Sequence, residues 1–446
     1  MAHKDIFSAL PTSAYIHIPF CRRRCFYCDF PISVVGNRLR GETSSTISQY
    51  VDFLCQEIAL APVFDFLRDL ENPSPNLSPA RREALTFPPS LPGKGVRGLG
   101  QGMILPYEVK SQVPASGQSL QTIFFGGGTP SLLSVQQLQH ILKALEQKFD
   151  ISPGAEISME IDPGTFDLEH IQGYRSAGIN RVSLGVQAFD ADLLQACGRS
   201  HSVNDIYKAV ELISQVGFPD FSIDLISGLP HQTLDRWQVS LEKTIAIAPT
   251  HISIYDLTIE PRTAFGRYYK GGTHPLPTDE TTVKMYQMAQ QILTSAGYEH
   301  YEISNYAQVG HQCRHNRVYW ENRPYYGFGM GAASYMEGKR YTRPRKTKEY
   351  YQWVETGCVI DCEVISADEI LLETLMLGLR LAEGVNLAVL KEQFGEKKVE
   401  EIEKCLQPYL HQGWVKLEGE RLRLSDPDGF LFSNVILAKL FAELGE

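Results

Sequence analysis

Short runs of β-branched and aromatic residues recur along the chain and alternate with stretches of helical periodicity. The segments 134–148 and 233–248, for example, carry apolar side chains at the three- and four-residue spacing of an amphipathic helix. Strands that each precede such a helix indicate repeated βα units around a parallel sheet, and therefore an α/β fold. Six strands are predicted in this way, at residues 14–20, 122–128, 156–162, 181–187, 221–228 and 251–258.

Six consecutive βα units favour a partial (β/α)6 barrel of the TIM type. A doubly wound open sheet is the competing architecture, because the hydrophobic pattern is the same in both. In a barrel the functional side chains gather at the C-terminal ends of the strands. Polar residues at the ends of the predicted strands are therefore the first candidates for a site.

One stretch lacks the apolar residues of a packed element. Residues 71–118 are dominated by Pro, Gly and Ser, with runs such as ENPSPNLSPARRE and FPPSLPGKGVRGLGQG. This composition cannot bury enough apolar surface to offset the entropy of ordering, which predicts a disordered surface insertion. The barrel is therefore expected to comprise residues 1–70 and 119–310.

The pattern changes beyond the barrel. Residues 311–366 are expected to form a connecting segment, and residues 367–446 show compact helices, a hairpin around Glu420 and a closing helix from Phe430. This order resembles a winged-helix module. Because none of its helices is markedly basic, we interpret the module as a packing or partner-binding domain rather than a DNA-binding one.

Composition narrows the setting of the protein. The chain has 446 residues, of which 43% are hydrophobic, and this suits two or three packed units. Its formal net charge of −10 argues against a nucleic-acid partner. Nine cysteines are too sparse for a disulfide framework, and no apolar run is long enough for a signal peptide or a membrane span. We therefore expect a reduced protein of the cytoplasm.

Three of the nine cysteines lie close together directly after the first predicted strand. Cys21, Cys25 and Cys28 form a C-x3-C-x2-C motif. A structural zinc site would need a fourth ligand, and no second CxxC motif lies nearby. A [4Fe–4S] cluster on three thiolates leaves one iron open for a ligand that is not protein. The motif therefore favours such a cluster over zinc.

These residues resemble the radical S-adenosylmethionine (SAM) enzymes, in which the open iron chelates the amino and carboxylate groups of SAM. The second predicted strand ends in GGGTP at residues 126–130, and in that family this segment meets the SAM amino group. The segments YIHIPFC, GGGTP, SLGVQ and DLISGLPHQT resemble the coproporphyrinogen dehydrogenase branch in particular. The resemblance implies SAM contacts at Tyr15, Tyr27, Gly127, Gly128, Thr129, Glu160, Gln187, Arg199 and Asp224.

A purely structural interpretation of the two acidic residues stays open. Glu160 and Asp224 could cap loops, or pair with Arg181 and Arg199, without meeting any ligand. Charged residues at strand ends often have such roles.

Two departures from the dehydrogenase pattern point to a different member of the branch. Phe30 stands where the dehydrogenases carry a fourth cysteine, and only fourteen residues precede Tyr15, where they carry an N-terminal extension. Residues 313–320 instead read CRHNRVYW. This H-N-x-x-Y-W pattern, followed by a glycine-rich segment, is similar to the haem chaperones of the branch.

The resemblance to the chaperones implies a haem site at this motif. His315 is the candidate axial ligand, Cys313 is a second candidate, and Tyr319 and Trp320 could stack on the porphyrin face. The alternative is that His315 and Trp320 pack beneath the last turn of the barrel without a ligand.

The function expected from the sequence is therefore that of a haem chaperone. It would hold a [4Fe–4S] cluster with SAM, bind haem b and deliver haem to apoproteins of respiration. Transient contact with the membrane surface and formation of a homodimer are both compatible with this function. One alternative is an oxygen-independent coproporphyrinogen III dehydrogenase, which makes protoporphyrinogen IX by SAM radical chemistry. Phe30 and the short N-terminus disfavour this enzyme. Another alternative, an interaction protein that has lost its cluster, is disfavoured because all three cysteines are present.

Overall fold

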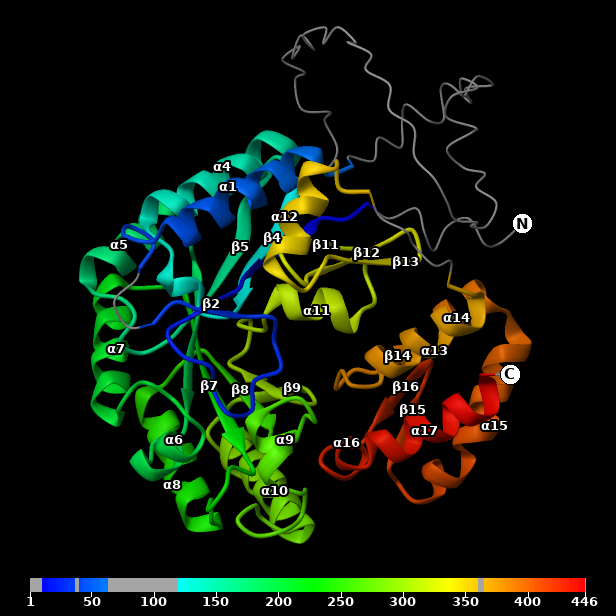
Figure 1. Cartoon of the computed structure of the whole chain (residues 1–446). Helices are drawn as coiled ribbons and strands as arrows, with labels where there is room; N and C mark the ends of the chain where they lie inside the picture. The colour runs from blue at the N-terminus through cyan, green and yellow to red at the C-terminus, as the bar shows by residue number, and fades with distance from the viewer. Residues whose placement is uncertain (1–9, 37–39, 63–118, 360–364, 446) are drawn as a thin grey trace, which may run out of the picture.

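The computed structural model describes residues 10–36, 40–62, 119–359 and 365–445, and the insertion predicted at 71–118 lies outside the described residues. Nine of the described strands form one sheet (Figure 1). They are β1 (Ser13–Ile18), β4 (Leu120–Gly127), β5 (Ile151–Ile161), β6 (Arg181–Gln187), β7 (Asp220–Ser227), β8 (His251–Asp256), β9 (Glu299–Glu302), β10 (Asn305–Ala307) and β11 (Tyr326–Phe328).

The strand order in this sheet is β11-β1-β4-β5-β6-β7-β8-β10-β9. From β1 to β8 each strand lies parallel to the next one along the chain. In a doubly wound sheet the order would reverse at a switch point, so this order excludes that alternative. The predicted α/β fold with six successive βα units is confirmed. In the described part of the chain the edge strands β11 and β9 do not pair, so the barrel is open there.

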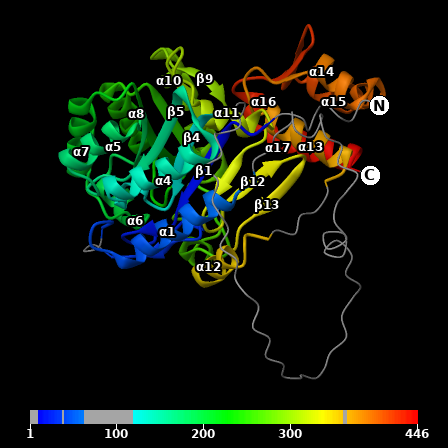
Figure 2. The same ribbon diagram turned by 90° about the horizontal axis from the view of Figure 1, so that it is seen from above.

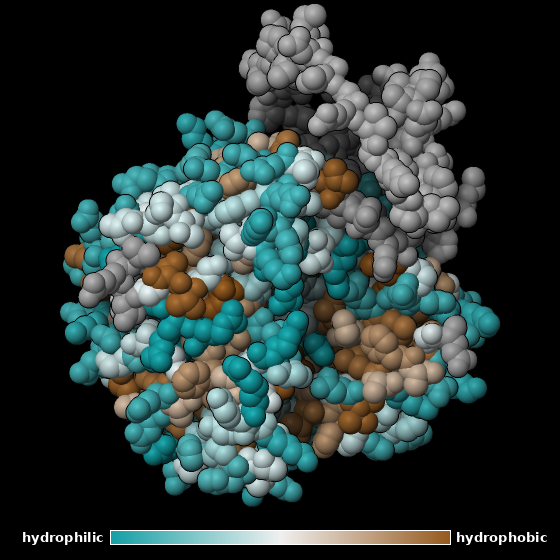
Figure 3. Space-filling model, in the orientation of Figure 1, coloured by the Kyte–Doolittle hydropathy of each residue, from teal (hydrophilic) through white to brown (hydrophobic). Residues whose placement is uncertain are grey.

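Helices cover the outer face of the curved sheet (Figures 1 and 2). The two helices predicted from periodicity are present, and helix α4 begins with a capping box in which Ser134 and Gln137 bond each other's backbone N–H groups. Their apolar faces pack on the sheet, whereas most of the surface in Figure 3 is hydrophilic. The outer helices are α1 (Ser45–Leu60), α4 (Val135–Phe149), α5 (Leu168–Ala177), α7 (Val203–Val216), α8 (Leu234–Ile247) and α10 (Asp279–Ser295). Two further helices are short: α6 (Ala191–Ala196) follows β6, and α9 (Ala264–Tyr268) packs against residues 26–27, where Phe265 N donates to Phe26 O at 2.9 Å.

The segment 311–366, expected to be a connector, contributes directly to the barrel. Its strand β11 pairs in parallel with β1, so it adds a seventh parallel strand that sequence periodicity did not predict. Three residues are too few for a periodic signal. The segment also contains α11 (Arg314–Trp320), the hairpin of β12 (Ala333–Met336) and β13 (Lys339–Thr342), and α12 (Thr347–Glu355).

The C-terminal module has its own apolar core and a three-stranded sheet in the order β14-β16-β15. The hairpin predicted around Glu420 is present in this sheet. The module is tied to the barrel where Ile303 N donates to Arg380 O at 3.0 Å and Ala382 N donates to Tyr301 O at 2.9 Å. Its elements are α13 (Ala367–Gly378), β14 (Val385–Asn386), α14 (Leu387–Phe394), α15 (Glu396–His411), β15 (Val415–Glu418), β16 (Arg421–Leu424), α16 (Asp428–Leu431) and α17 (Ser433–Leu444).

Across the described ranges, every helix is too short or too polar to cross a lipid bilayer.

Candidate cluster and SAM site, and the haem motif

The three cysteines of the motif line one cavity at the C-terminal ends of the barrel strands. Cys21 ends β2 (Phe20–Cys21), and Cys25 and Cys28 lie in the loop that leads to β3 (Ser33–Val34). The cavity has a volume of about 810 Å³, which lies within the usual range for a cofactor pocket. All cysteines of the described residues are free thiols. Three soft ligands therefore face one cofactor-sized space.

Residues 21–34, which we call the cysteine loop, are braced from within and from the barrel. The Arg24 guanidinium donates to the carbonyl oxygens of Cys28 and Phe30, both at 3.2 Å. Phe26 N donates to Cys197 O at 3.1 Å, which ties the loop to the segment after β6. The loop is therefore braced by contacts within itself and to the barrel.

The donor set fits a [4Fe–4S] cluster better than a single metal ion. In the described part of the chain, no three His, Cys, Asp or Glu side chains are arranged so that together they could hold one ion. A cluster does not need such an arrangement, because each thiolate binds a different iron. The three thiols on the wall of a cofactor-sized cavity are the soft ligands that such a cluster binds.

Two neighbouring side chains direct hydrogen-bond donors at the sulfur atoms. Thr129 Oγ1 lies 3.7 Å from Cys21 Sγ, and Arg199 Nη1 lies 3.6 Å from Cys25 Sγ. Burial raises the pKa of the Cys21 thiol to about 12, and a nearby positive charge would favour its thiolate form. Donors to sulfur stabilise thiolates and tune iron–sulfur centres.

The glycines after β4 allow a close approach of the backbone to the cysteine loop. Gly127 has φ +112°, and a Cβ there would overlap the His17 ring. A Cβ on Gly128 would lie 2.7 Å from the carbonyl oxygen of Phe20, the residue before the first cysteine. Only glycine fits both positions without displacing its neighbours.

Two carboxyl groups face the cavity beside the glycines, and both are more basic than usual. Glu160 Oε2 accepts from Gly127 N at 3.0 Å, and burial together with the nearby Asp224 raises the pKa of Glu160 to about 8. Burial raises the pKa of Asp224 to about 6, although Ser183 Oγ donates to it at 2.7 Å. A cationic group in the cavity would stabilise the ionised form of both.

The remaining predicted SAM contacts are on the same walls. Tyr15 stacks on Phe124 with ring centroids 6.3 Å apart, and Tyr27 lies against Phe265. Gln187 has φ +67°, at the point where the register between β6 and β7 shifts. The cavity brings together every residue predicted to contact SAM: Tyr15, Tyr27, Gly127, Gly128, Thr129, Glu160, Gln187, Arg199 and Asp224.

The alternative pairing of Glu160 or Asp224 with the two arginines is not what the structure shows. Arg199 forms its ion pair with Asp162, and Arg181 forms its own with other residues at the opposite end of the barrel. Among the described residues, Glu160 and Asp224 therefore face the cavity without an arginine partner.

Asp162 is a site residue that the sequence analysis missed. Its carboxylate accepts from Thr129 Oγ1 at 3.0 Å and pairs with Arg199, so it contacts both side chains that approach the cysteine sulfurs. Its position two residues after Glu160, at the end of a predicted strand, could have identified it as a candidate. The pairing itself joins segments far apart in sequence and could not be predicted.

We expect Asp162→Asn to weaken retention of the cluster. The substitution removes the charge that holds the buried Arg199 guanidinium beside Cys25. The rate at which a chelator bleaches the iron–sulfur absorbance should rise about tenfold, because outer-shell partners of metal ligands commonly contribute that much. Asp235→Asn, an exposed substitution on α8, is the matched control. Equal bleaching rates in the wild type and Asp162→Asn would contradict the assigned role.

The predicted haem residues lie at the other end of the barrel. Helix α11 packs against the N-terminal half of β4, where His315 Nδ1 bonds Thr122 Oγ1 at 2.8 Å. His315 Nε2 bonds Tyr319 Oη at 2.9 Å, and the imidazole stacks on Phe124 with centroids 5.2 Å apart. The side chain is 0% exposed. In this conformation both ring nitrogens of His315 have protein partners.

The other residues of the motif surround His315. Cys313 is buried, with Sγ 3.6 Å from Glu156 Oε1. Tyr319 packs edge-on against Tyr325 with centroids 4.7 Å apart, and Trp320 ends the helix, half-buried. All of them are described, and none of them lines the cavity of the cysteine loop.

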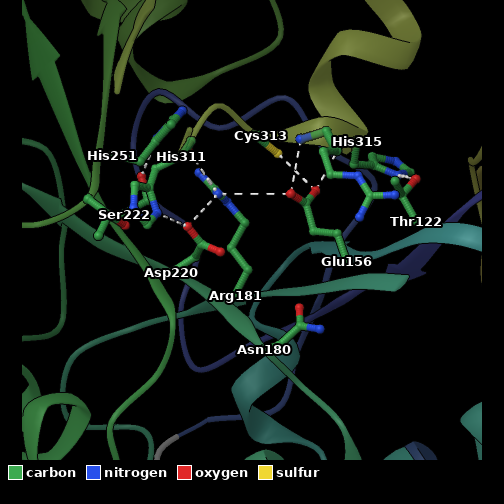
Figure 4. Close-up of polar contacts among 12 residues, drawn as sticks. Thr122, Glu156, Asn180, Arg181, Asp220, Ser222, His251, His311, Cys313 and His315 are labelled. Atoms are coloured by element: carbon green, nitrogen blue, oxygen red, sulfur yellow. Dashed lines mark hydrogen bonds and ion pairs between the residues drawn. The ribbon is translucent and has the colours of Figure 1, made fainter. Parts of the chain in front are cut away.

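A network of charged side chains closes this end of the barrel beneath α11 (Figure 4). Glu156 on β5 accepts from Arg314 N at 3.0 Å and from His315 N at 2.9 Å. Arg181 on β6 lies between Glu156, at 3.9 Å, and Asp220 on β7, at 3.4 Å. The inward positions of these strands are polar at both ends of the barrel, which apolar periodicity alone does not anticipate.

The buried imidazole of His315 predicts a pH dependence of stability. Burial lowers its pKa to about 3, so the unfolded chain binds a proton below about pH 6.5 that the folded chain does not. Stability is therefore lost progressively between pH 6.5 and 3, by about 2 kcal/mol between pH 7 and 5. Urea denaturation at pH 7 and at pH 5 measures the loss of unfolding free energy between the two pH values. We expect this loss to be smaller in His315→Gln than in the wild type by about 2 kcal/mol. Equal losses in both proteins would contradict the prediction.

Comparison with known proteins supports a family assignment. The model of the radical SAM superfamily matches residues 105–243, and that of the HemN C-terminal domain matches residues 365–431. A protein described as "Heme chaperone HemW" from Synechocystis sp. is 44% identical over 98% of each chain. The Escherichia coli protein of the same description is 34% identical over 77% of this chain and 76% of its own.

A solved structure shares the fold. The coproporphyrinogen III oxidase HemN of Escherichia coli superimposes with a TM-score of 0.73 over 97% of this chain and 90% of that chain, at 22% sequence identity. At that identity the likeness concerns the fold, which includes both the barrel and the C-terminal module.

Proposed function

Because the chain belongs to the HemW family of radical SAM proteins, we propose that it is a haem chaperone that binds haem together with a [4Fe–4S] cluster and SAM and delivers the haem to apoproteins. The observation that carries this proposal is the 44% identity to a relative described as a heme chaperone over 98% of both chains. We expect the acceptors to be haem proteins of respiration, reached from the cytoplasm by transient contact with the membrane surface.

Membership of the radical SAM superfamily implies the cluster and SAM. The residues that would hold the cluster are Cys21, Cys25 and Cys28, and its open iron would chelate the amino and carboxylate groups of SAM. Thr129 and Arg199 would steady the thiolates, and Glu160 and Asp224 would offer negative charge to the cationic methionyl end of SAM. The walls of the cavity would shield these groups from bulk water.

The haem would bind at the H-N-x-x-Y-W motif. His315 is the proposed axial ligand and Cys313 a second one, with Tyr319 and Trp320 against the porphyrin. His315 is neutral at physiological pH because burial lowers its pKa, and a neutral imidazole is the form that binds iron.

Haem titration tests the proposal. We expect the full-length protein to give a saturable, red-shifted Soret band, and His315→Ala to weaken haem binding at least tenfold. His140→Ala is the control, because His140 is an exposed histidine on α4, away from the motif. A His315→Ala variant with wild-type affinity would remove this residue from the ligand role, and a wild type that never shifts the Soret band would refute the proposal.

A coproporphyrinogen III dehydrogenase is the second candidate, favoured by the HemN-like fold over 97% of the chain. Phe30 stands against it: it replaces the fourth cysteine of that pattern and is 57% exposed at the cavity. The anaerobically reconstituted protein should therefore form no protoporphyrinogen from coproporphyrinogen with SAM. Measurable formation would reverse the order of the two candidates.

A further inference from the structure

The proposed axial ligand is closed off in this conformation. Coordination of haem iron needs a free lone pair on an imidazole nitrogen and open space beside the ring. The nitrogens of His315 bond Thr122 and Tyr319, and one face of the ring lies on Phe124. With 0% of the residue exposed, a porphyrin has no access to it.

One side chain, Glu156, holds the start of α11. Its carboxylate accepts from the backbone N–H groups of Arg314 at 3.0 Å and His315 at 2.9 Å, and the Cys313 thiol lies 3.6 Å away. These are two of the N–H groups that the first turn of a helix leaves without partners. The carboxylate is itself buried in the barrel wall, so docking of α11 depends strongly on its charge.

The same end of α11 is clamped a second time. The Arg181 guanidinium donates to His311 O at 3.2 Å, and Asp220 Oδ1 lies 2.7 Å from His311 Nδ1. Figure 4 shows Arg181 between Glu156 and Asp220. Among the described residues, one buried nitrogen of Arg181, Nη2, has no hydrogen-bond partner. The charge network is therefore connected, but it leaves one buried donor unsatisfied, which makes it less stabilising than a complete network.

The far end of α11 is attached to the C-terminal module instead. Arg317 Nη2 pairs with Glu383 at 2.6 Å, and Asn322 Nδ2 donates to Thr374 Oγ1 at 3.2 Å. Both contacts are more exposed than those of Glu156 and are correspondingly weaker. The helix thus bridges two packed units, with its buried anchor on the barrel.

We propose that α11 is a gate: the structure shows the closed state, and haem reaches His315 only when α11 undocks from Glu156 and Thr122. This inference rests on the proposed function, in which His315 is the axial ligand. The apparent haem affinity is the affinity of the open state multiplied by the fraction of molecules that are open. Interactions that dock the helix therefore oppose haem binding, although they contact the haem motif.

The gate makes an unusual prediction, namely that two substitutions at its docking contacts speed up haem binding. Glu156→Gln keeps the shape of the side chain but removes the charge, and Thr122→Val removes a partner of His315. In stopped-flow Soret measurements on the full chain, we expect Glu156→Gln to raise the haem association rate roughly tenfold, the factor that a charge-assisted hydrogen bond contributes. Glu146→Gln, exposed on α4, should have no effect.

A measurement without haem separates the gate from the proposed function. Amide hydrogen exchange of the 313–320 segment should be faster in Glu156→Gln than in the wild type, while exchange of the outer helix α7 is unchanged. Accelerated exchange without any haem binding would refute the proposed function and leave only the docking contacts. Haem binding at wild-type rates in both Glu156→Gln and Thr122→Val would overturn the gate and leave the chaperone proposal standing. If Glu156→Gln does not fold, Thr122→Val alone decides.

Discussion

Replacement of Cys25 by serine removes the broad iron–sulfur absorbance of the anaerobically reconstituted protein and reduces its iron from about four atoms per chain to background. Serine retains the size of the side chain but replaces a soft thiolate by a hard hydroxyl that does not hold iron in such clusters. Cys25 stands midway in the motif and is the sulfur that Arg199 approaches at 3.6 Å. With two thiolates left, we expect no cluster to assemble.

The matched control for this prediction is Cys55→Ser. Cys55 lies on α1 in a separate groove between α1 and α4, away from the cysteine loop, and should be dispensable for iron. Iron and zinc are measured together, by elemental analysis of protein reconstituted without oxygen. A full iron complement in Cys25→Ser, or tightly bound zinc in place of iron in the wild type, would contradict the assignment.

Replacement of Glu57 by alanine is expected to have the largest effect on stability. Glu57 on α1 is 2% exposed, and Arg343, whose Nε lies 2.8 Å from it, is 5% exposed. The same carboxylate accepts from Tyr350 Oη at 2.7 Å and from Gly329 N at 2.8 Å. The substitution leaves a buried guanidinium unpaired and two further donors unsatisfied, which should cost about 3–5 kcal/mol.

Two comparisons test the cause of that loss. Glu349 forms an exposed ion pair with Lys346, so urea denaturation should show little change in the free energy of unfolding in Glu349→Ala. The double variant Glu57→Leu with Arg343→Met should recover part of the stability lost in Glu57→Ala, because it leaves no buried charge. A double variant that is no more stable than Glu57→Ala would show that lost packing, not the unpaired charge, causes the loss.

The sequence predicts well whatever depends on local pattern. Runs of β-branched and aromatic residues followed by helical periodicity predicted six strands and their helices. Polar residues at the strand ends placed Glu160, Gln187 and Asp224 on one cavity wall. The spacing of the cysteines brought them to the same wall. The C-terminal ends of parallel strands lie at the same end of the barrel, so residues at those ends are close together in space.

Pairings between distant elements could not be predicted. Whether Arg199 would meet Asp162 or Glu160, and Arg181 meet Glu156 or Asp224, depends on strand tilt and side-chain direction rather than on sequence spacing. The closed position of His315 likewise depends on Thr122, which is 193 residues away. Short strands such as β11 carry no period and are defined only by their neighbours.

The most direct test of the central claim is a haem titration of the anaerobically reconstituted full-length protein, followed at the Soret band with and without SAM. We predict a saturable red shift in a protein that retains its iron–sulfur absorbance, and we expect His315→Ala to lose the red shift but keep that absorbance. A Soret band that remains that of free haem at every concentration, while the cluster and SAM are bound, would contradict it.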